Sequence, residues 1–463
     1  MTPLSLASQP QRVSALVPML LASGLTLAGF AVTVLALYPG YLTNDATYIY
    51  GYMHDWHLGD WQSPLETILW WLIDPLAPGP GSMFLLIVTF YWLGFGLVAL
   101  AVAQRAGAVA IAVPLLALTP PAFILLSMIW RDMLFSGIWL LAAAILYLVA
   151  DRSGWLRIGA QILALVLIGC GILLRPNAIV AAPFLIAYAL WPTRLQWKRT
   201  ALLFIPAVAA GYGLIHLVYY DILNVKRENP LHSLLVFDLG GISYFAQENV
   251  FPVTWTPEEN ALLLKRCYEP QHWDSYWTLE PCNFVMARLE RKDEPIFGTQ
   301  RLIDAWVSAV KAHPLAYLEH RLTVLWTLLG RENYVLEIHK MPLPEEAPIA
   351  QNSYFRALLP LQDAIKSSIL YRGGFWLLLA AAIAAWAWPA RLGASGAFAV
   401  SVAATGLAYL LSFGVFAVAT DFRYLHLGVV TALAALVPSL IARREARPKL
   451  LKQQVAGAVK PSG

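Results

Sequence analysis

Residues 82–103 read SMFLLIVTFYWLGFGLVALAVA, an apolar run without a charged side chain. A helix of about 20 apolar residues is long enough to cross the hydrocarbon core of a bilayer. The rest of the chain has the same character, because hydrophobic residues make up 59% of its 463 residues and charged residues only 13%. A soluble domain carries about 25% charged residues. This composition excludes a soluble enzyme and a disordered chain.

We therefore expect an all-α polytopic membrane protein with about ten transmembrane helices. Apolar runs predict spans over 13–37, 82–103, 108–129, 133–150, 158–174, 177–192, 201–220, 373–390, 394–418 and 425–442. The first run has no small-residue cleavage site before Tyr38, so we interpret it as an uncleaved anchor. The short run at 177–192 carries Pro183, which leaves its ends poorly defined.

The placement of lysine and arginine sets the orientation of these spans. With the N-terminus in the cytoplasm, the cytoplasmic segments hold 14 basic residues, whereas the loop 38–81 holds none. Ten spans return the C-terminus to the cytoplasm, which the basic tail from Arg443 to Lys460 supports. The loop 38–81 and the segment 221–372 are then expected on the outer side.

The pattern divides the chain into four parts. These are a seven-span module at 1–220 with its outer loop 38–81, an outer segment at 221–372, a three-span module at 373–442, and a basic tail at 443–463. In the first outer loop, residues 56–71 are amphipathic and rich in tryptophan, which favours a membrane-parallel helix. Residues 315–329 also suit a helix against the bilayer, but His320 and Arg321 argue against full spanning.

Three cysteines are too few for a disulfide scaffold. Cys267 and Cys282 both fall in the outer segment, where an oxidising compartment permits a disulfide between them. Two unrelated buried thiols are the alternative, since geometry decides pairing. Cys170 lies in a span and is expected to serve packing.

Ionisable residues gather at the outer ends of the spans, where they are costly and tend to mark function or pairing. The clusters are Asp45 after the first span, Arg131-Asp132, Arg175 with Asn177, and Asp421 with Arg423 and Tyr424. Each cluster also has a structural interpretation: a solvated acid, a turn pair that neutralises itself, or an arginine that reaches lipid headgroups. The other acids of the first loop, including Asp55, Asp60 and Glu66, fit surface positions better.

Arginines beside carboxylates suit the transfer of a group from a lipid phosphate. A guanidinium matches the geometry of phosphate oxygens, and a carboxylate can deprotonate an acceptor hydroxyl. The sequence has no dinucleotide fingerprint, P-loop, nucleophile elbow or His-Glu-x-x-His motif. Its histidines show no metal-ligand spacing. The outer location favours a membrane-bound donor over a nucleotide sugar.

At these residues the sequence resembles the GT-C superfamily of integral membrane glycosyltransferases, which use polyprenyl-phosphate sugars. The likeness covers the seven-span module at 1–220 and rests on the order of short motifs: Asn44-Asp45, Trp61-Gln-Ser-Pro-Leu65, Arg131-Asp132, Leu174-Arg-Pro-Asn177, and, beyond that module, His313-Pro-x-x-Tyr317 and Asp421-Phe-Arg-Tyr424. Ser63 and Gln62 replace a proline and a histidine of the family pattern. With the single acid at Asn44-Asp45, a divalent metal is possible but not favoured, and no cofactor is certain.

The resemblance implies an inverting glycosyltransferase of a bacterial inner membrane, with the active site in the periplasm. It implies catalytic roles for Asp45 and Asp132, and donor or substrate binding by Arg131, Arg175, Asn177, Arg423 and Tyr424. The expected partners are a polyprenyl-phosphate sugar, an acceptor hydroxyl on a lipid-linked glycan, lipid A, polysaccharide or protein, and membrane lipids, with no nucleic acid. A flippase for lipid-linked sugars, a non-catalytic assembly subunit and a polysaccharide polymerase or ligase remain alternatives.

Overall fold

The computed structural model describes residues 9–331 and 348–458, so Lys460 and part of the predicted outer segment lie outside the described residues. Within this range the protein is helical, apart from three isolated β-bridges. Eight helical stretches are long and apolar enough to cross a membrane. They contain α1 (Gln9–Leu37), α4 (Pro80–Ala106), α7 (Arg131–Leu148), α8 (Trp155–Leu174), α10 (Trp197–His216), α19 (Gly373–Ala387), α20 (Ala394–Phe416) and α21 (His426–Ala458). The fold is that of an all-α polytopic membrane protein.

The predicted span 108–129 is not one continuous helix. It forms η2 (Gly107–Ile111), α5 (Ala112–Leu116), α6 (Pro120–Phe123) and η3 (Ile124–Ser127). Prolines at 114, 120 and 121 interrupt it, because proline lacks the N–H that continues a helix. Arg105 Nη2 lies 2.6 Å from Asp151 Oδ2, so α4 and α7 end at the same end of the bundle. The broken segment between them therefore runs back along the bundle.

The predicted span 177–192 is interrupted as well. It forms η4 (Pro176–Val180) and α9 (Ala182–Leu190), because Pro176 and Pro183 restart the helix twice. Gln161 Nε2 donates to Ala189 O over 2.7 Å, which places the end of α9 beside the first turns of α8. Eight continuous helices and two interrupted segments thus give ten passes through the bundle in the described part of the chain.

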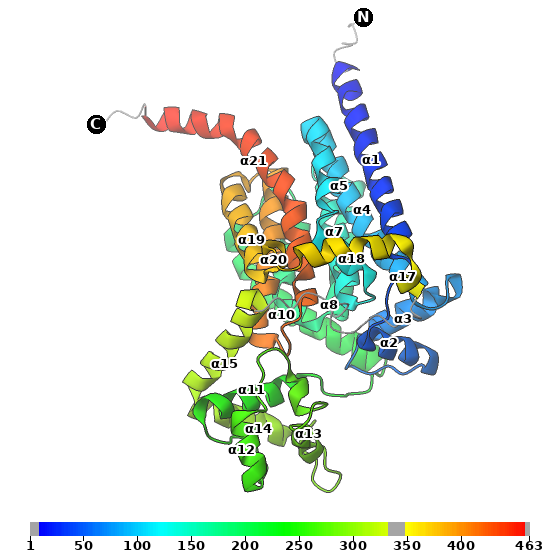
Figure 1. Ribbon diagram of the computed structural model, residues 1–463. Coiled ribbons are helices and arrows are strands. Elements are labelled where there is room, and N and C mark those ends of the chain that lie inside the picture. Colours follow the sequence, from blue (N-terminus) through cyan, green and yellow to red (C-terminus); the bar gives the residue numbers. More distant parts are fainter. Residues whose placement is uncertain (1–8, 332–347, 459–463) are drawn as a thin grey trace, which may run out of the picture.

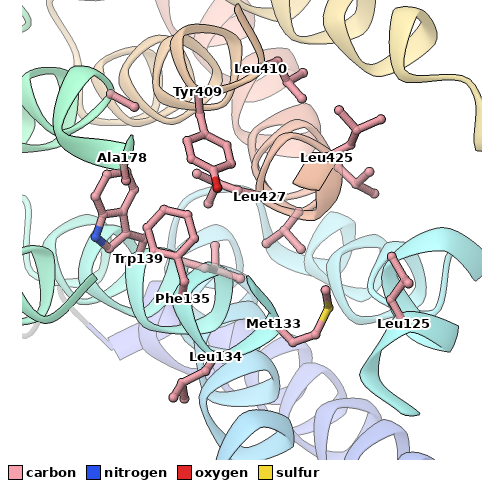
Figure 2. Packing of buried hydrophobic residues seen from close by; sticks show 14 of the residues in the cluster. Leu125, Met133, Leu134, Phe135, Trp139, Ala178, Tyr409, Leu410, Leu425 and Leu427 are labelled. Atoms are coloured by element: carbon pink, nitrogen blue, oxygen red, sulfur yellow. The ribbon is translucent and has the colours of Figure 1, made fainter. Parts of the chain in front are cut away.

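Helix α7 lies at the centre of the bundle. It packs closely against α4, α8 and α21, and nearly all its side chains are buried. Figure 2 shows Phe135 and Trp139 of α7 facing Tyr409 of α20, with ring centres 5.3 Å apart for Phe135 and Tyr409. Trp139 Nε1 donates to Ile168 O of α8 over 3.1 Å. The packing of this core determines where the side chains of the first turn of α7, Arg131 and Asp132, point.

Two short helices, α2 (Asn44–Asp55) and α3 (Pro64–Ile73), fill the loop between α1 and α4. Thr43 and Ser63 cap their N-termini by accepting hydrogen bonds from Ala46 N and Glu66 N. Figure 1 shows α2, α3 and the helices α11–α14 at the end of the molecule away from both termini. We call this end the loop end.

Residues 231–326, in the segment between α10 and α19, form a helical unit at the loop end. It comprises α11 (Leu231–Ala246), α12 (Pro257–Lys265), α13 (Phe284–Leu289), α14 (Gln300–Ala312) and α15 (Pro314–Trp326), followed by α17 (Pro348–Gln351) and α18 (Ser353–Ile365). Cys267 and Cys282 are joined in a disulfide, and both are buried. In Figure 1, α15 leads from this unit back to the bundle.

His320 and Arg321 of α15 are buried inside this unit. His320 Nε2 lies 3.1 Å from Asp238 Oδ1 of α11, and Arg321 also pairs with Asp238. Arg321 Nη1 donates to Ala417 O at the end of α20 over 2.8 Å. A buried charge cluster therefore ties the unit to the loop that follows α20. The opposite face of α15 leaves Leu315, Leu318, Leu322 and Trp326 exposed.

Candidate active site

The segment before α2 is bonded to the segment before α7. Tyr41 N donates to Ser127 O over 2.7 Å, and Ile129 N donates to Tyr41 O over 3.1 Å. Trp130 Nε1 donates to Thr43 Oγ1 over 2.8 Å. These bonds place the first turns of α2 and α7 side by side, although the two helices lie far apart in the sequence.

Asp45 of α2 is paired with Arg423, which lies in η10 (Phe422–Leu425) between α20 and α21. Arg423 Nη1 lies 2.7 Å from Asp45 Oδ2, and Arg423 Nε lies 3.1 Å from Asp421 Oδ2. The guanidinium also stacks over the ring of Trp130 at 4.7 Å. The Asp45 side chain keeps 42% of its surface exposed, so it remains accessible from outside while it is paired.

Asp132 and Arg175 form a second, buried ion pair. Arg175 Nε donates to Asp132 Oδ1 over 2.7 Å, and Arg175 Nη2 contacts the same oxygen. The ring of Tyr424 lies 5.0 Å from the Arg175 guanidinium and stacks on Phe413. The pair joins α7 to the end of α8, and Asp132 faces the protein interior.

Arg131 has no carboxylate within ion-pair distance among the described residues. It precedes Asp132 on α7, but residues i and i+1 of a helix point about 100° apart. Arg131 therefore faces the cavity while Asp132 faces Arg175. Arg175 and Arg423 are each paired with a carboxylate, so Arg131 is the arginine of the site most available to bind an external anion.

These groups surround a cavity of about 480 Å³ at the loop end. Asp45, Arg131, Arg175, Asn177, Arg423 and Tyr424 line it, and Trp61, Trp273, Trp277 and Asp274 line it as well. Asp132 lies in a much smaller space beneath, which Asp45, Arg131, Arg175 and Arg423 share. The structure thus brings the clusters that the sequence placed at one end of the spans into one site.

No protein-family model and no curated protein sequence matches the chain. A solved structure to which the chain is similar is the apo crystal structure of ArnT from Cupriavidus metallidurans, at 16% sequence identity. The alignment covers 95% of this chain and 80% of that chain, with a TM-score of 0.31. The chemistry assigned to the cavity therefore rests on its own geometry and not on this likeness.

The arginines keep Asp45 ionised. Burial opposes its charge, but Arg423, Arg131 and Arg175 outweigh this effect and hold the pKa of Asp45 below its ordinary value. At Asp421 burial dominates and raises the pKa, although Arg423 opposes it. Of the two carboxylates beside Arg423, Asp45 is therefore the one that better neutralises its charge.

No group of three or more His, Cys, Asp and Glu side chains is placed to share a metal ion in the part of the chain that the structure describes. A carboxylate with three neighbouring guanidinium groups instead forms a site that can accept a proton at one point and hold a phosphate nearby.

Glu66 of α3 is a buried acid that interacts electrostatically with Arg131 of the site and that sequence reasoning missed. The sequence favoured a surface position, but its side chain is fully buried and neither carboxyl oxygen has a hydrogen-bond partner among the described residues. Burial raises the pKa of Glu66 to about 8, although Arg131 opposes this. The one sequence signal for burial was its position in the amphipathic stretch 56–71, because one face of an amphipathic helix packs against the protein.

Replacing Glu66 by Gln is expected to stabilise the protein at pH 8. Between the ordinary pKa of 4.5 and about 8, folded Glu66 holds a proton that the unfolded chain has released, so stability falls as pH rises through this window. Glu66→Gln removes this dependence and should add about 1–3 kcal/mol at pH 8 and little near pH 5. The midpoint of thermal unfolding at the two pH values measures the effect.

The exposed Glu258→Gln on α12 provides the matched control, and it should leave both midpoints unchanged. A Glu66→Gln protein that is less stable than wild type at both pH values would show that the carboxylate form of Glu66 is the stabilising one.

Proposed function

We propose that the protein is a membrane glycosyltransferase that moves a sugar from a polyprenyl-phosphate donor to an acceptor hydroxyl. The observation that carries this proposal is the cavity in which an accessible carboxylate, Asp45, lies beside Arg131, whose guanidinium has no ion-pair partner among the described residues. The resemblance of the sequence to the GT-C superfamily also supports it. The acceptor hydroxyl belongs to a lipid-linked glycan, lipid A, a polysaccharide or a protein.

The proposed reaction is a single displacement with inversion. The acceptor oxygen attacks the anomeric carbon, the bond from that carbon to the phosphate oxygen breaks, and Asp45 takes the acceptor proton. Arg131 binds the donor phosphate and stabilises the charge that develops on it as polyprenyl phosphate leaves. Because the phosphate also attracts Arg423, donor binding weakens the Arg423–Asp45 pair and frees the carboxylate for the acceptor.

The remaining residues act around this centre. We assign Asp132 a positioning role, because its carboxylate is held by Arg175 and lies beneath the cavity. Arg175, Asn177 and Tyr424 line the donor side of the cavity. The proposed setting is a bacterial inner membrane with both termini in the cytoplasm and the loop end in the periplasm, because the basic residues concentrate on the opposite side.

The proposal is tested with the full chain in lipid nanodiscs and a polyprenyl phosphate that carries a radiolabelled sugar. Total envelope glycolipid and polysaccharide serve as acceptors. We expect release of polyprenyl phosphate together with label in the acceptor fraction. Arg131→Gln should raise the KM for the donor about tenfold or more, because it removes a charged hydrogen bond to the phosphate. Arg152→Gln, an exposed arginine beyond α7, is the control.

The alternatives give different results in this assay and in sealed vesicles. A flippase moves the labelled lipid across the membrane with the bond between sugar and phosphate intact. A non-catalytic assembly subunit gives neither movement nor cleavage, and it tolerates Arg131→Gln and Asp45→Asn. Either result would overturn the transferase proposal.

A further inference from the structure

Three tryptophans form the side of the cavity contributed by the loops. Trp61 lies between α2 and α3, and Trp273 and Trp277 lie between α12 and α13. The rings of Trp273 and Trp277 stack 5.5 Å apart at an interplanar angle of 27°, and the Trp61 ring lies 5.9 Å from each. We call Trp61, Trp273 and Trp277 the aromatic wall.

The aromatic wall is open to an occupant. Trp273 is buried, but Trp277 keeps 46% of its surface exposed, and all three rings line the cavity. The exposed carboxylate of Asp274 lies next to them at the cavity, and it has no ion-pair partner among the described residues. An exposed tryptophan ring that is backed by two further tryptophans and lies next to a carboxylate unpaired among the described residues is unusual for a surface that only serves packing.

The loop that carries the wall is held in place. The Cys267–Cys282 disulfide encloses it, and Ser275 Oγ donates to Cys267 O over 2.8 Å. Trp273 N donates to Val418 O over 2.9 Å, so the loop is bonded to the segment between α20 and η10. That segment leads directly into Arg423. The wall and the arginines therefore keep a fixed relative position, as the two halves of a binding site require.

We propose that the aromatic wall is a carbohydrate subsite that holds a pyranose ring of a glycan acceptor. A pyranose presents a face of C–H groups that packs on an aromatic ring, and its edge presents hydroxyl groups that donate to a carboxylate. Trp277 supplies the exposed ring face, Trp273 supports it by stacking on its ring, and Asp274 supplies the oxygens that accept these hydrogen bonds. This inference rests on the proposed function and narrows its acceptor to an oligosaccharide.

Charge and shape specify the ligand further. Asp274 has no ion-pair partner among the described residues and lies beside the aromatic wall, so at this subsite a neutral or amino sugar is preferred to an acidic one. Trp277 also lines a second hollow of about 340 Å³, together with Asn283 and Glu290. A chain of several sugars can therefore pass over Trp277, with its terminal residue directed into the cavity toward Asp45.

The test measures binding of free sugars, which requires no donor and no turnover. The full chain in nanodiscs is titrated with four neutral trisaccharides, built from glucose, mannose, galactose and N-acetylglucosamine, and binding is followed by saturation-transfer difference NMR. We expect at least one to bind, and Trp277→Ala to weaken it about tenfold. Trp277→Phe should keep most of the affinity. Trp155→Ala, an 87% exposed tryptophan at the start of α8, is the matched control.

Two outcomes would overturn the inference. One is that no trisaccharide binds, or that binding ignores both Trp277→Ala and Trp273→Phe. The other is that Trp277→Ala weakens binding of the polyprenyl-phosphate sugar but of no trisaccharide, which would assign the wall to the sugar of the donor. The proposed function is judged separately, because cleavage of the donor in the transfer assay does not depend on these results.

Discussion

The Asp45→Asn protein is expected to transfer sugar about 10³ times more slowly than wild type. Asparagine keeps the shape of the side chain and an oxygen that can accept from Arg423, but it cannot take the acceptor proton. General base catalysis contributes typically about 10²–10⁴-fold. The loss should fall on kcat, whereas binding of the donor should not weaken, since Arg131 and Arg423 bind the phosphate and Asp45 competes with it for Arg423.

The pH dependence gives an independent measure of the same role. The pKa of Asp45 lies below its ordinary value of 3.8, so the carboxylate is ionised from neutral pH down to that range. The Asp45 contribution to kcat/KM should therefore disappear only as pH falls through the lowered pKa, and Asp45→Asn should remove that acidic limb. The same group contributes to folding above the pKa of the unfolded chain and loses this contribution as pH falls.

Asp55→Asn is the matched control, because Asp55 is exposed on the same helix α2 and does not line the cavity. It should retain the wild-type rate. If Asp45→Asn kept more than about a tenth of the rate while binding donor normally, the proton would have another acceptor, since general base catalysis contributes at least about 10²-fold.

The sequence was sufficient for the architecture of the bundle because membrane passes are encoded locally. Long apolar runs need no tertiary information to be recognised, and in the described part of the chain eight of the ten predicted runs correspond to helices long and apolar enough to cross a membrane. The sequence was less informative about whether each pass is one unbroken helix. Proline positions indicate where helices 107–127 and 176–190 break, but neighbouring helices decide whether the chain still continues across the bundle.

The candidate residues chosen from the sequence line one cavity or the small space beneath it, but the pairing among them did not follow from the sequence. Arg131 and Asp132 are adjacent in the chain, which left a pair that neutralises itself as the alternative to a functional role. The helix separates them, so that Asp132 pairs with Arg175 of a different segment and Arg131 is left facing the cavity. Which arginine lacks an ion-pair partner depends on the directions in which the side chains of α7 point. Those directions are known only once α7 is packed against its neighbours.

The aromatic wall shows a second limit. Trp273 and Trp277 lie in a segment that matched no motif, and they contact Trp61, which belongs to the distant first outer loop. Tryptophan in a membrane protein usually marks the interface with lipid headgroups. The disulfide and the hydrogen bonds to residues 418–420 hold this loop in place, and the folded structure shows that its tryptophans line a cavity.

Breaking the buried Asp132–Arg175 pair is expected to have the largest effect on stability. Arg175→Met leaves the Asp132 carboxylate buried without its partner, and removing one partner of such a pair costs about 3–5 kcal/mol. The combined Asp132→Asn and Arg175→Met protein should recover most of this loss, because neither charge remains buried. The midpoint of thermal unfolding in nanodiscs is measured for wild type, Asp132→Asn, Arg175→Met and the combined protein, which together form a double-mutant cycle.

Asp151→Asn is the control for this cycle, because it removes a surface pair with Arg105 in which Asp151 is mostly exposed, and it should cost less than about 1 kcal/mol. Additive losses in the cycle would contradict a coupled buried pair. The double variant also separates two roles that a single substitution confuses. If it folds but binds donor weakly, Arg175 contributes to the phosphate site itself. If it folds and binds donor normally, the pair only positions α7, and the phosphate depends on Arg131 and Arg423.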